Sequence, residues 1–243
     1  MTKQTEIPDW ETLLAHAALL QTKIPAAILV GGTAAALHAR HRISFDHDHV
    51  IKNLAKNYDA AILALESIAG WRTHRRVNGK MILGNVNKIG AGLRNQRRSA
   101  PLETIEISLP DGHRLRLPTI EETLRIKTFL LVDRNATRDY LDVAALSNHI
   151  GLSKSAVALE RMNELYAEFE DEAGNVLTAV AVKLSVPDPY DLTDIDLSMR
   201  HQVSMRPSAR SNVARVLCER PMQSGTPRRS IALLPRKNHG ARK

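Results

Sequence analysis

Residues 26–48 read AAILVGGTAAALHARHRISFDHD and combine an apolar run, a glycine pair, an alanine-rich segment and two aspartates one residue apart. The apolar run at 26–30 is short and is followed by Gly31 and Gly32, as is typical of a buried strand that ends in a turn. The alanine-rich residues 33–40 then predict a short helix. This order of strand, glycine turn and helix is the basis of the fold prediction.

The next segment, ISFDHDHVI at 43–51, predicts a second strand. Side chains alternate between the faces of a strand, so Asp46 and Asp48 should point the same way. Two adjacent carboxylates repel each other unless a positive charge lies between them. Mg²⁺ fits that position because it prefers carboxylate oxygens, water and substrate phosphates as ligands. The pair therefore predicts a magnesium site.

The turn Gly31-Gly32-Thr33 has a complementary property. Backbone N–H groups at a helix N-terminus, with the positive end of the helix dipole, attract phosphate groups. Each feature is common by itself, and a purely structural role for either one is the simpler interpretation. Their combination on consecutive elements is more specific, and it favours a nucleotide triphosphate bound beside a metal.

Histidines crowd the same stretch and suggest a competing metal-hydrolase site. His47 and His49 alternate with the aspartates and should lie on the opposite face of the strand, so one ion cannot easily be bound by all four side chains. We therefore favour partly buried packing roles for the histidines. The four residues concerned are His38, His41, His47 and His49.

Composition bounds the class of protein. The chain has 243 residues and 43% hydrophobic content, enough to bury a sizeable core. Its longest apolar runs are too short to cross a bilayer, and residues 1–11 lack the layout of a secretory signal, so we expect a cytoplasmic protein with no membrane partner. The single cysteine, Cys218, excludes an internal disulfide and any multi-cysteine zinc site.

The formal charge of +8 is unevenly distributed. From Arg200 onward there are eleven Lys and Arg residues against one acid, so residues 1–199 carry 23 basic and 25 acidic residues. Within that nearly neutral part, residues 72–98 contain no acid and predict a surface for a polyanion. Their basic residues are Arg72, Arg75, Arg76, Lys80, Lys88, Arg94, Arg97 and Arg98.

The rest of the chain divides by its periodicity into strand-rich and helical parts. Helical spacing predicts helices over 9–21 and 53–69, and alternation predicts strands over 71–93 and a hairpin from 102–109 to 113–118. After Thr119, which begins a Thr-x-x-Glu capping box, the period is helical, with helices expected over 119–134, 135–148 and 153–171, whereas 174–186 is ambiguous. We expect an α+β fold with three parts: 1–118, a helical domain 119–186, and a polar, basic, weakly ordered tail 187–243 that includes a possible short helix at 211–219.

One motif on the second strand resembles a known family. The residues Arg42, Ser44, Asp46 and Asp48 form the pattern R-x-S-x-D-x-D after the glycine turn, and 126–146, IKTFLLVDRNATRDYLDVAAL, contains a lysine, an arginine and a basic-Asp-x-x-Asp pattern. Together they resemble the DNA polymerase beta-type nucleotidyltransferases, and within them the AbiEii/AbiGii toxin family of toxin–antitoxin systems. The resemblance covers roughly residues 26–165 and implies a polymerase beta-like core with a small mixed sheet flanked by helices.

The resemblance also implies roles for single residues. Asp46 and Asp48 would bind Mg²⁺, and Gly31, Gly32, Thr33 and Ser44 would surround the NTP. Members of the superfamily usually add a third carboxylate from a later strand, and Glu106 is our choice. Lys127 would contact the triphosphate, and Asp139 would orient Lys127 or Arg134. The competing interpretation of Lys127 and Asp139 is a surface ion pair between adjacent helices.

These expectations combine into one hypothesis with open alternatives. The hypothesis is a Mg²⁺-dependent nucleotidyltransferase that transfers a nucleoside monophosphate from an NTP to a hydroxyl acceptor and releases pyrophosphate. The basic segment 72–98 favours RNA, and tRNA among RNAs, as the acceptor. The family resemblance implies a toxin with a cognate antitoxin. The alternatives are a protein or small-molecule acceptor, an inactive nucleotide-binding protein, and a nucleic-acid-binding protein that acts through its tail.

Overall fold

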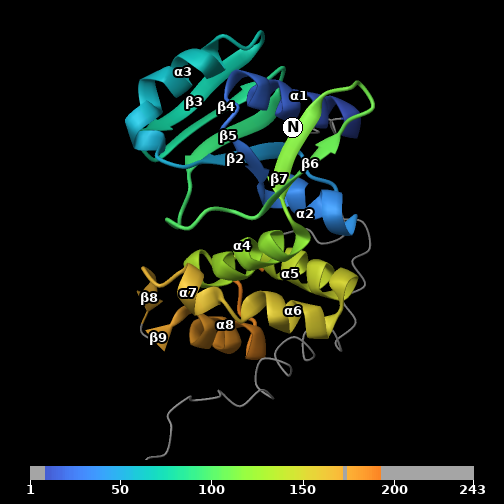
Figure 1. The fold of residues 1–243 in the computed structure, drawn as a ribbon, viewed down its shortest axis with the longest axis vertical. Coiled ribbons are helices and arrows are strands. Elements are labelled where there is room, and N and C mark those ends of the chain that lie inside the picture. The colour runs from blue at the N-terminus through green and yellow to red at the C-terminus, as the bar shows by residue number, and fades with distance from the viewer. Residues whose placement is uncertain (1–8, 172–173, 193–243) are drawn as a thin grey trace, which may run out of the picture.

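The structure, a computed structural model, describes residues 9–171 and 174–192. It is an α+β fold with two stacked parts (Figure 1): a mixed five-stranded sheet with helices and a hairpin, and a layer of helices below it. The predicted fold class is confirmed. In chain order the elements are α1 (Trp10–Lys23), β1 (Ile28–Val30), α2 (Gly31–Ala39), β2 (Asp46–Ile51), the 3₁₀-helix η1 (Leu54–Asn57), α3 (Tyr58–Glu66), β3 (Trp71–Val77), β4 (Met81–Val86), β5 (Ile89–Asn95), β6 (Thr104–Ser108), β7 (Arg114–Pro118), α4 (Ile120–Asp133), α5 (Thr137–Ile150), α6 (Leu152–Leu159), α7 (Met162–Leu165), β8 (Glu170–Asp171), β9 (Gly174–Asn175) and α8 (Val176–Ser185).

The strands of the main sheet follow the order β1-β2-β5-β4-β3. β2 and β5 run parallel, and the other neighbours are antiparallel. The parallel pair sets Asp46 opposite Gly90 and Asp48 opposite Gly92. β6 and β7 form the predicted hairpin, which is a separate two-stranded sheet. Strand β2 is therefore an interior strand, with the edge strand β1 on one side and the glycine-containing strand β5 on the other.

Local chemistry explains where the main elements begin. Thr119 caps α4 by accepting a hydrogen bond from the Glu122 N–H, as the sequence predicts, and Asp9 caps α1 by accepting one from the Thr12 N–H. Helix α2 begins at Gly31, whose φ of +76° is a conformation that glycine adopts without strain.

Several predicted boundaries differ from those observed. β2 begins at Asp46 and not at residue 43, and the helix expected over 153–171 is interrupted, giving α6 and α7. The ambiguous apolar residues 174–186 are mostly the helix α8, which Asn175 caps. Helical spacing of apolar residues was sufficient to predict the 14-residue helices α1, α4 and α5, whereas breaks inside a helical pattern depend on tertiary packing.

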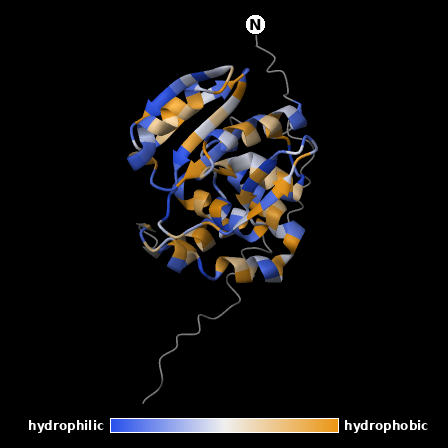
Figure 2. Ribbon diagram, turned by 45° about the horizontal axis from the view of Figure 1, so that its top comes forward, coloured by the Kyte–Doolittle hydropathy of each residue, from blue (hydrophilic) through white to orange (hydrophobic). Residues whose placement is uncertain are grey.

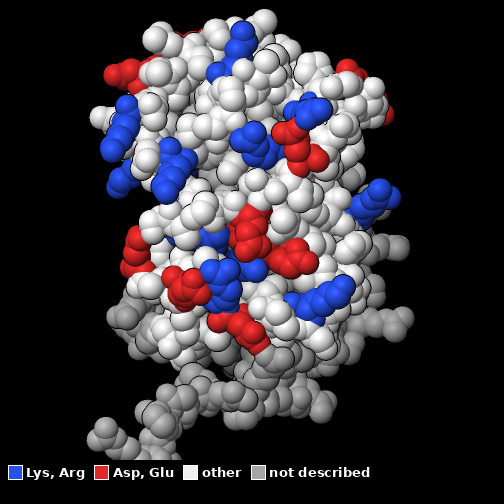
Figure 3. Space-filling model, viewed as in Figure 1, with Lys and Arg blue, Asp and Glu red and all other residues white. Residues whose placement is uncertain are grey.

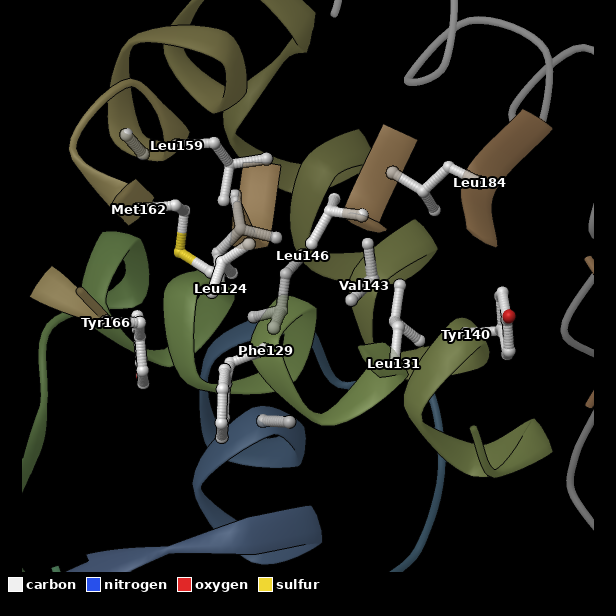
Figure 4. Close-up of a cluster of buried hydrophobic side chains, with 14 residues drawn as sticks. Leu124, Phe129, Leu131, Tyr140, Val143, Leu146, Leu159, Met162, Tyr166 and Leu184 are labelled. Carbon is white, nitrogen blue, oxygen red and sulfur yellow. The ribbon is translucent and has the colours of Figure 1, made fainter. Parts of the chain in front are cut away.

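Three hydrophobic clusters hold the elements together. One packs α1 and α3 on the sheet through Leu20, Leu65, Ile82 and Leu93, and a second joins α1 to the hairpin. The third unites the lower helices (Figure 4), where the rings of Phe129 and Tyr166 stack with centroids 4.2 Å apart. Figure 2 shows hydrophobic and hydrophilic residues interleaved along the helices, as expected for helices with one buried face.

The segment just before residue 193 is held against helix α5. The Asp191 carboxylate accepts a hydrogen bond of 2.7 Å from the Thr137 N–H, and the Tyr190 N–H donates to the Asn135 carbonyl. Residues 187–192, the start of the predicted weakly ordered tail, are thus attached to the helical layer. The remainder of that tail, including the short helix expected at 211–219, lies outside the described residues.

Within residues 9–171 and 174–192, every helix is too short or too polar to span a lipid bilayer.

Candidate active site at strand β2

Asp46 and Asp48 lie on the same face of β2, as predicted, and the preceding turn fixes their strand. The Thr33 hydroxyl donates a hydrogen bond to the Asp46 carbonyl, which ties the start of α2 to the start of β2. The Ser44 hydroxyl lies 3.3 Å from Asp46 Oδ1, in position to donate to it. Thr33 and Ser44 are both buried, whereas Asp46 is accessible. The buried hydroxyls therefore hold a carboxylate that remains open to solvent.

Glycines make the space into which these carboxylates extend. A Cβ added at Gly92 would overlap Asp48 Oδ1, and one at Gly90 would lie 3.2 Å from the Asp46 Cβ. On the other side, a Cβ at Gly31 would lie 3.4 Å from the Asp48 Cβ. The turn and the aspartates are thus adjacent, as the sequence predicts. The two β5 glycines were not predicted, although a glycine inside a strand often marks the close approach of another group.

The electrostatics of the aspartate pair are unbalanced. Partial burial and the nearby Asp48 charge raise the pKa of Asp46, and the opposing effects of Arg138, Ser44 and Arg42 do not cancel that rise. Asp48 has a loose ion pair with Arg94, whose Nε lies 3.6 Å from Oδ1. A carboxylate pair whose ionisation is disfavoured would gain from a bound cation. The site is therefore chemically suited to a divalent metal.

Glu106 does not join the pair, and the predicted convergence of three carboxylates is wrong for this structure. Glu106 lies on β6, in the separate hairpin, and its exposed carboxylate accepts a hydrogen bond of 2.9 Å from Arg114. In the described part of the chain, no group of three or more His, Cys, Asp or Glu side chains is arranged to hold a metal ion. The alternation of strand 102–109 could predict facing along the strand, but not which sheet the strand would join.

Lys127 and Asp139 occupy a buried ionic cluster, and the surface ion pair considered above is wrong. The Lys127 Nζ lies 3.2 Å from Asp139 Oδ1 and 2.7 Å from Asp142 Oδ2, and all three side chains are at most 1% exposed. Arg134 donates two hydrogen bonds to Asp139, of 2.6 and 2.8 Å. Asp139 thus contacts both Lys127 and Arg134. The direct contact of Lys127 with a triphosphate stays a prediction, since both carboxylates already enclose the ammonium.

Asp142 is the member of this cluster to which the sequence assigned no role. Its carboxylate accepts hydrogen bonds from Arg42 Nε at 2.7 Å and Arg42 Nη2 at 3.0 Å, and lies 2.7 Å from His41 Nε2. Burial alone would raise the pKa of Asp142, but the charge of Lys127 and the bonds from His41 and Arg42 hold it well below its usual value. Asp142 is therefore ionised and fully partnered.

Arg42 links this cluster to the glycine turn. A Cβ added at Gly32 would overlap the Arg42 guanidinium, so the missing side chain at Gly32 makes room for Arg42. The sequence assigned Gly32 to the nucleotide phosphates, and the structure gives it this packing role as well. Through Arg42 and Asp142, the turn before α2 is connected to α5 by a buried ion pair.

The histidines lie apart from the aspartates. His47 and His49 are 0% exposed on the opposite face of β2, and burial lowers the pKa of His47 to about 4. His41 binds Asp142, and His38 Nε2 is 2.9 Å from the Pro118 carbonyl oxygen. These positions agree with packing roles and leave the aspartate face without histidine ligands.

Comparison with known proteins identifies the fold. No protein-family model matches the chain. The structure is similar to MenT4, the nucleotidyltransferase toxin Rv2826c of Mycobacterium tuberculosis H37Rv, with a TM-score of 0.58 and 15% sequence identity over 88% of this chain and 84% of that one. The chain has a nucleotidyltransferase fold. The enzyme ANT(2″)-Ia, solved with adenylyl-2″-tobramycin, aligns with a TM-score of 0.47 and 15% identity over 63% of this chain and 97% of that one.

Sequence comparison finds a different set of mycobacterial proteins. The heme uptake protein MmpL11 of M. tuberculosis H37Rv is 32% identical over 143 residues, which are 59% of this chain and 13% of that protein. The transport protein MmpL11 of Mycobacterium leprae is 36% identical over 100 residues, 41% of this chain and 10% of that protein. The chain thus spans about an eighth or less of the length of these relatives.

Proposed function

We propose that this protein is a Mg²⁺-dependent nucleotidyltransferase that transfers a nucleoside monophosphate from an NTP to a hydroxyl acceptor. One observation carries the proposal: Asp46 and Asp48 stand side by side next to the Gly31 turn, accessible and without a full set of cationic partners. In the reaction the acceptor oxygen bonds to the α-phosphorus, the bond to the bridging oxygen breaks, pyrophosphate leaves, and the hydroxyl proton is released to solvent.

The donor set fits a magnesium ion. Asp46 and Asp48 would hold it, and the raised pKa of Asp46 reports a carboxylate that a cation would stabilise in its ionised form. A bound divalent ion would neutralise charge on the phosphates and on the reacting oxygens. Two protein carboxylates leave most of the coordination sphere for phosphate oxygens and water, as is usual for Mg²⁺.

Other residues of the chain bind and orient the substrate in this proposal. The N–H groups at the start of α2, around Gly31 and Thr33, attract phosphate oxygens. Ser44 holds the Asp46 carboxylate. The buried cluster of Lys127, Asp139 and Asp142 positions α5 against the glycine turn through Arg42. In this proposal residues 1–118 form the nucleotidyltransferase core and residues 119–186 form the helical domain.

The acceptor and the biological role are finer parts of the same proposal. RNA, with tRNA as the first candidate, is favoured by the basic residues of β3 and β5. The R-x-S-x-D-x-D pattern and the likeness to the MenT4 toxin support a toxin of the AbiEii kind, neutralised by a cognate antitoxin. Expression in a bacterial host should then slow growth, and the Asp48→Asn variant should not.

The decisive experiment supplies the purified full chain with each of the four α-³²P-labelled NTPs, Mg²⁺ and a bacterial extract. We expect metal-dependent label in the RNA fraction that is lost in the Asp46→Asn and Asp48→Asn variants. Asp59→Asn, on the far helix α3, is the matched control and should label normally. Label that appears in protein or small molecules would overturn the choice of acceptor. Label that persists in both variants would overturn the mechanism.

A further inference from the structure

The open face of the main sheet extends from the aspartates to the edge strand β3 in two rows of cross-strand neighbours. One row is Asp48, Gly92, Leu83 and Arg75, and the other is Asp46, Gly90, Asn85 and Arg72. Paired residues of adjacent strands point to the same face, so each row places an arginine on the aspartate side. At about 4.8 Å per strand, the arginine end of each row lies roughly 14 Å from the aspartate end.

A β-bulge brings both arginines to this face. Arg72 and Arg75 are three residues apart and would point to opposite faces of a regular strand. The register shifts between Thr73 and Arg75, which inserts one residue and restores the common direction. Arg76, the next residue, then points to the other face, where its guanidinium binds Glu66 of α3 at 3.1 Å. The two faces of β3 thus carry separate arginines.

Exposure also distinguishes the two faces. On the α3 side, Ile82 and Val86 of β4 are at most 1% exposed. On the aspartate side, Met81, Leu83 and Asn85 of the same strand are partly exposed. The helices α1 and α3 pack on the first face through the shared hydrophobic cluster. The aspartate face of β4 is therefore accessible among the described residues.

Apart from the two aspartates of β2, the charged residues that β3, β4 and β5 place on this face are basic. Residues 71–95, which include β3, β4 and β5, contain no Asp or Glu. Arg72 and Arg75 are exposed, and Arg94 lies nearer the site, loosely paired to Asp48. Arg98, which the sequence placed in the same basic surface, is 4% exposed and binds Glu122, so it does not contribute. In Figure 3, Lys and Arg side chains gather on one flank of the upper part, whereas both charges mix over the lower helices.

We propose that this face binds a single-stranded RNA acceptor, with Arg75 and Arg72 on its phosphates and Arg94 next to the reacting end. The inference rests on the proposed function and specifies which surface holds the acceptor. The positive charge of this face is complementary to the phosphates of RNA. The same positive charge would repel the basic segment from Arg200 onward, which is therefore disfavoured as the occupant of this face. The rows contain no aromatic side chain, and exposed His74 at the bulge, 2.6 Å from Asn85, is the one ring that hydrogen-bonds to them among the described residues, so we expect recognition mainly through the phosphate backbone.

The test measures binding of a short, fluorescently labelled single-stranded RNA by the full chain over a range of salt concentrations, without NTP. The Arg72→Ala/Arg75→Ala variant should bind at least about tenfold more weakly at low salt and should reduce the salt slope by about 1.4, for two lost phosphate contacts. The matched control, Arg76→Ala/Arg114→Ala, removes two exposed arginines that lie off this face and should bind like the wild type.

The outcomes separate this inference from the proposed function. Urea unfolding first establishes that all three proteins are folded. If both double variants then bind RNA as tightly as the wild type, or if both lose affinity equally, the proposal that RNA binds on this face is wrong. Label transfer that is normal in Arg72→Ala/Arg75→Ala overturns it as well. Absence of label transfer in the wild type counts against the enzyme alone, because binding is measured without catalysis.

Discussion

The two aspartate pairs of this protein lie in opposite environments. Asp46 and Asp48 on β2 are accessible and repel each other, and their only ion pair within 4 Å among the described residues is the loose contact of Asp48 with Arg94. Asp139 and Asp142 on α5 are 0% exposed and are enclosed by Lys127, Arg134, Arg42 and His41. The spacing of the two pairs in the sequence is similar, and their surroundings decide what each can do. A carboxylate that already has its partners holds structure, whereas one that lacks them can take a ligand.

The largest expected effect is on activity, from the open pair. Asp48→Asn removes a charge that the proposed metal and phosphates need, and we expect nucleotidyl transfer to fall by about 10³-fold. Its unfolding free energy should stay the same or rise slightly, because repulsion with Asp46 is relieved. Rates with labelled NTP and urea unfolding measure the two quantities. A large loss of stability would contradict the contrast between the pairs.

The reverse result is expected for the closed pair. Asp142→Ala leaves Lys127 and Arg42 buried without their main anion, and it should lower the unfolding free energy by about 3–5 kcal/mol. Asp59→Ala, on the surface of α3, is the control and should stay within about 0.5 kcal/mol of the wild type. Urea unfolding at neutral pH is the measurement. A stable Asp142→Ala protein would show that the cluster is not structural.

The pH dependence of stability tests the buried face of β2, which carries His47 and His49 opposite the two aspartates. The pKa of buried His47 is lowered to about 4, so the unfolded chain takes up a proton before the folded one does as the pH falls below 6.5. His47 by itself should lower the unfolding free energy by about 2–3 kcal/mol between pH 7.5 and pH 4.5, and buried His49, whose pKa is also lowered, adds to the drop. Because the pKa of Asp142 is lowered, the stability that its ionised carboxylate contributes is lost only below about pH 4. His47→Leu should reduce the drop by the His47 share and leave the His49 share, and a pH dependence equal to that of the wild type would refute this assignment.

The smallest effect concerns the space beside the open pair. A Cβ at Gly92 would overlap Asp48 Oδ1, so Gly92→Ala should displace that carboxylate and slow transfer by about tenfold. Gly112→Ala is the contrasting change, because Gly112 has open space around it but a φ of +84°. It should cost about 1 kcal/mol of stability and leave the rate unchanged. Equal rates in the two variants would show that Asp48 tolerates the intrusion.

Much of this site follows from residues close together in the sequence. The i, i+2 spacing of Asp46 and Asp48 fixes their common face, and the same alternation correctly sends His47 and His49 the other way. The glycine turn and the capping residues Asp9 and Thr119 are also local signals. Each of these depends on a few consecutive residues and not on the tertiary fold.

The errors concern long-range pairing. Glu106 has the facing of a mid-strand carboxylate, but its strand pairs with β7 in a separate sheet. Lys127 was expected to contact a triphosphate or to form a surface ion pair with Asp139, and its burial between Asp139 and Asp142 depends on how α4 packs against α5. The roles of Gly90 and Gly92 in β5 were not predicted, because a glycine in such a segment can mark either a turn or a close approach. Only the register of β2 with β5 decides between these possibilities.

The ion pair between Arg42 and Asp142 has a consequence for how the molecule can move. It joins the sheet part to the helical part beneath the glycine turn, and the buried pair of Arg98 and Glu122 joins them a second time. A hinge between the two parts would have to separate both pairs, each at a cost of several kcal/mol. The two parts are therefore expected to keep one relative arrangement, so that ligands of the proposed site would enter a site that is already assembled.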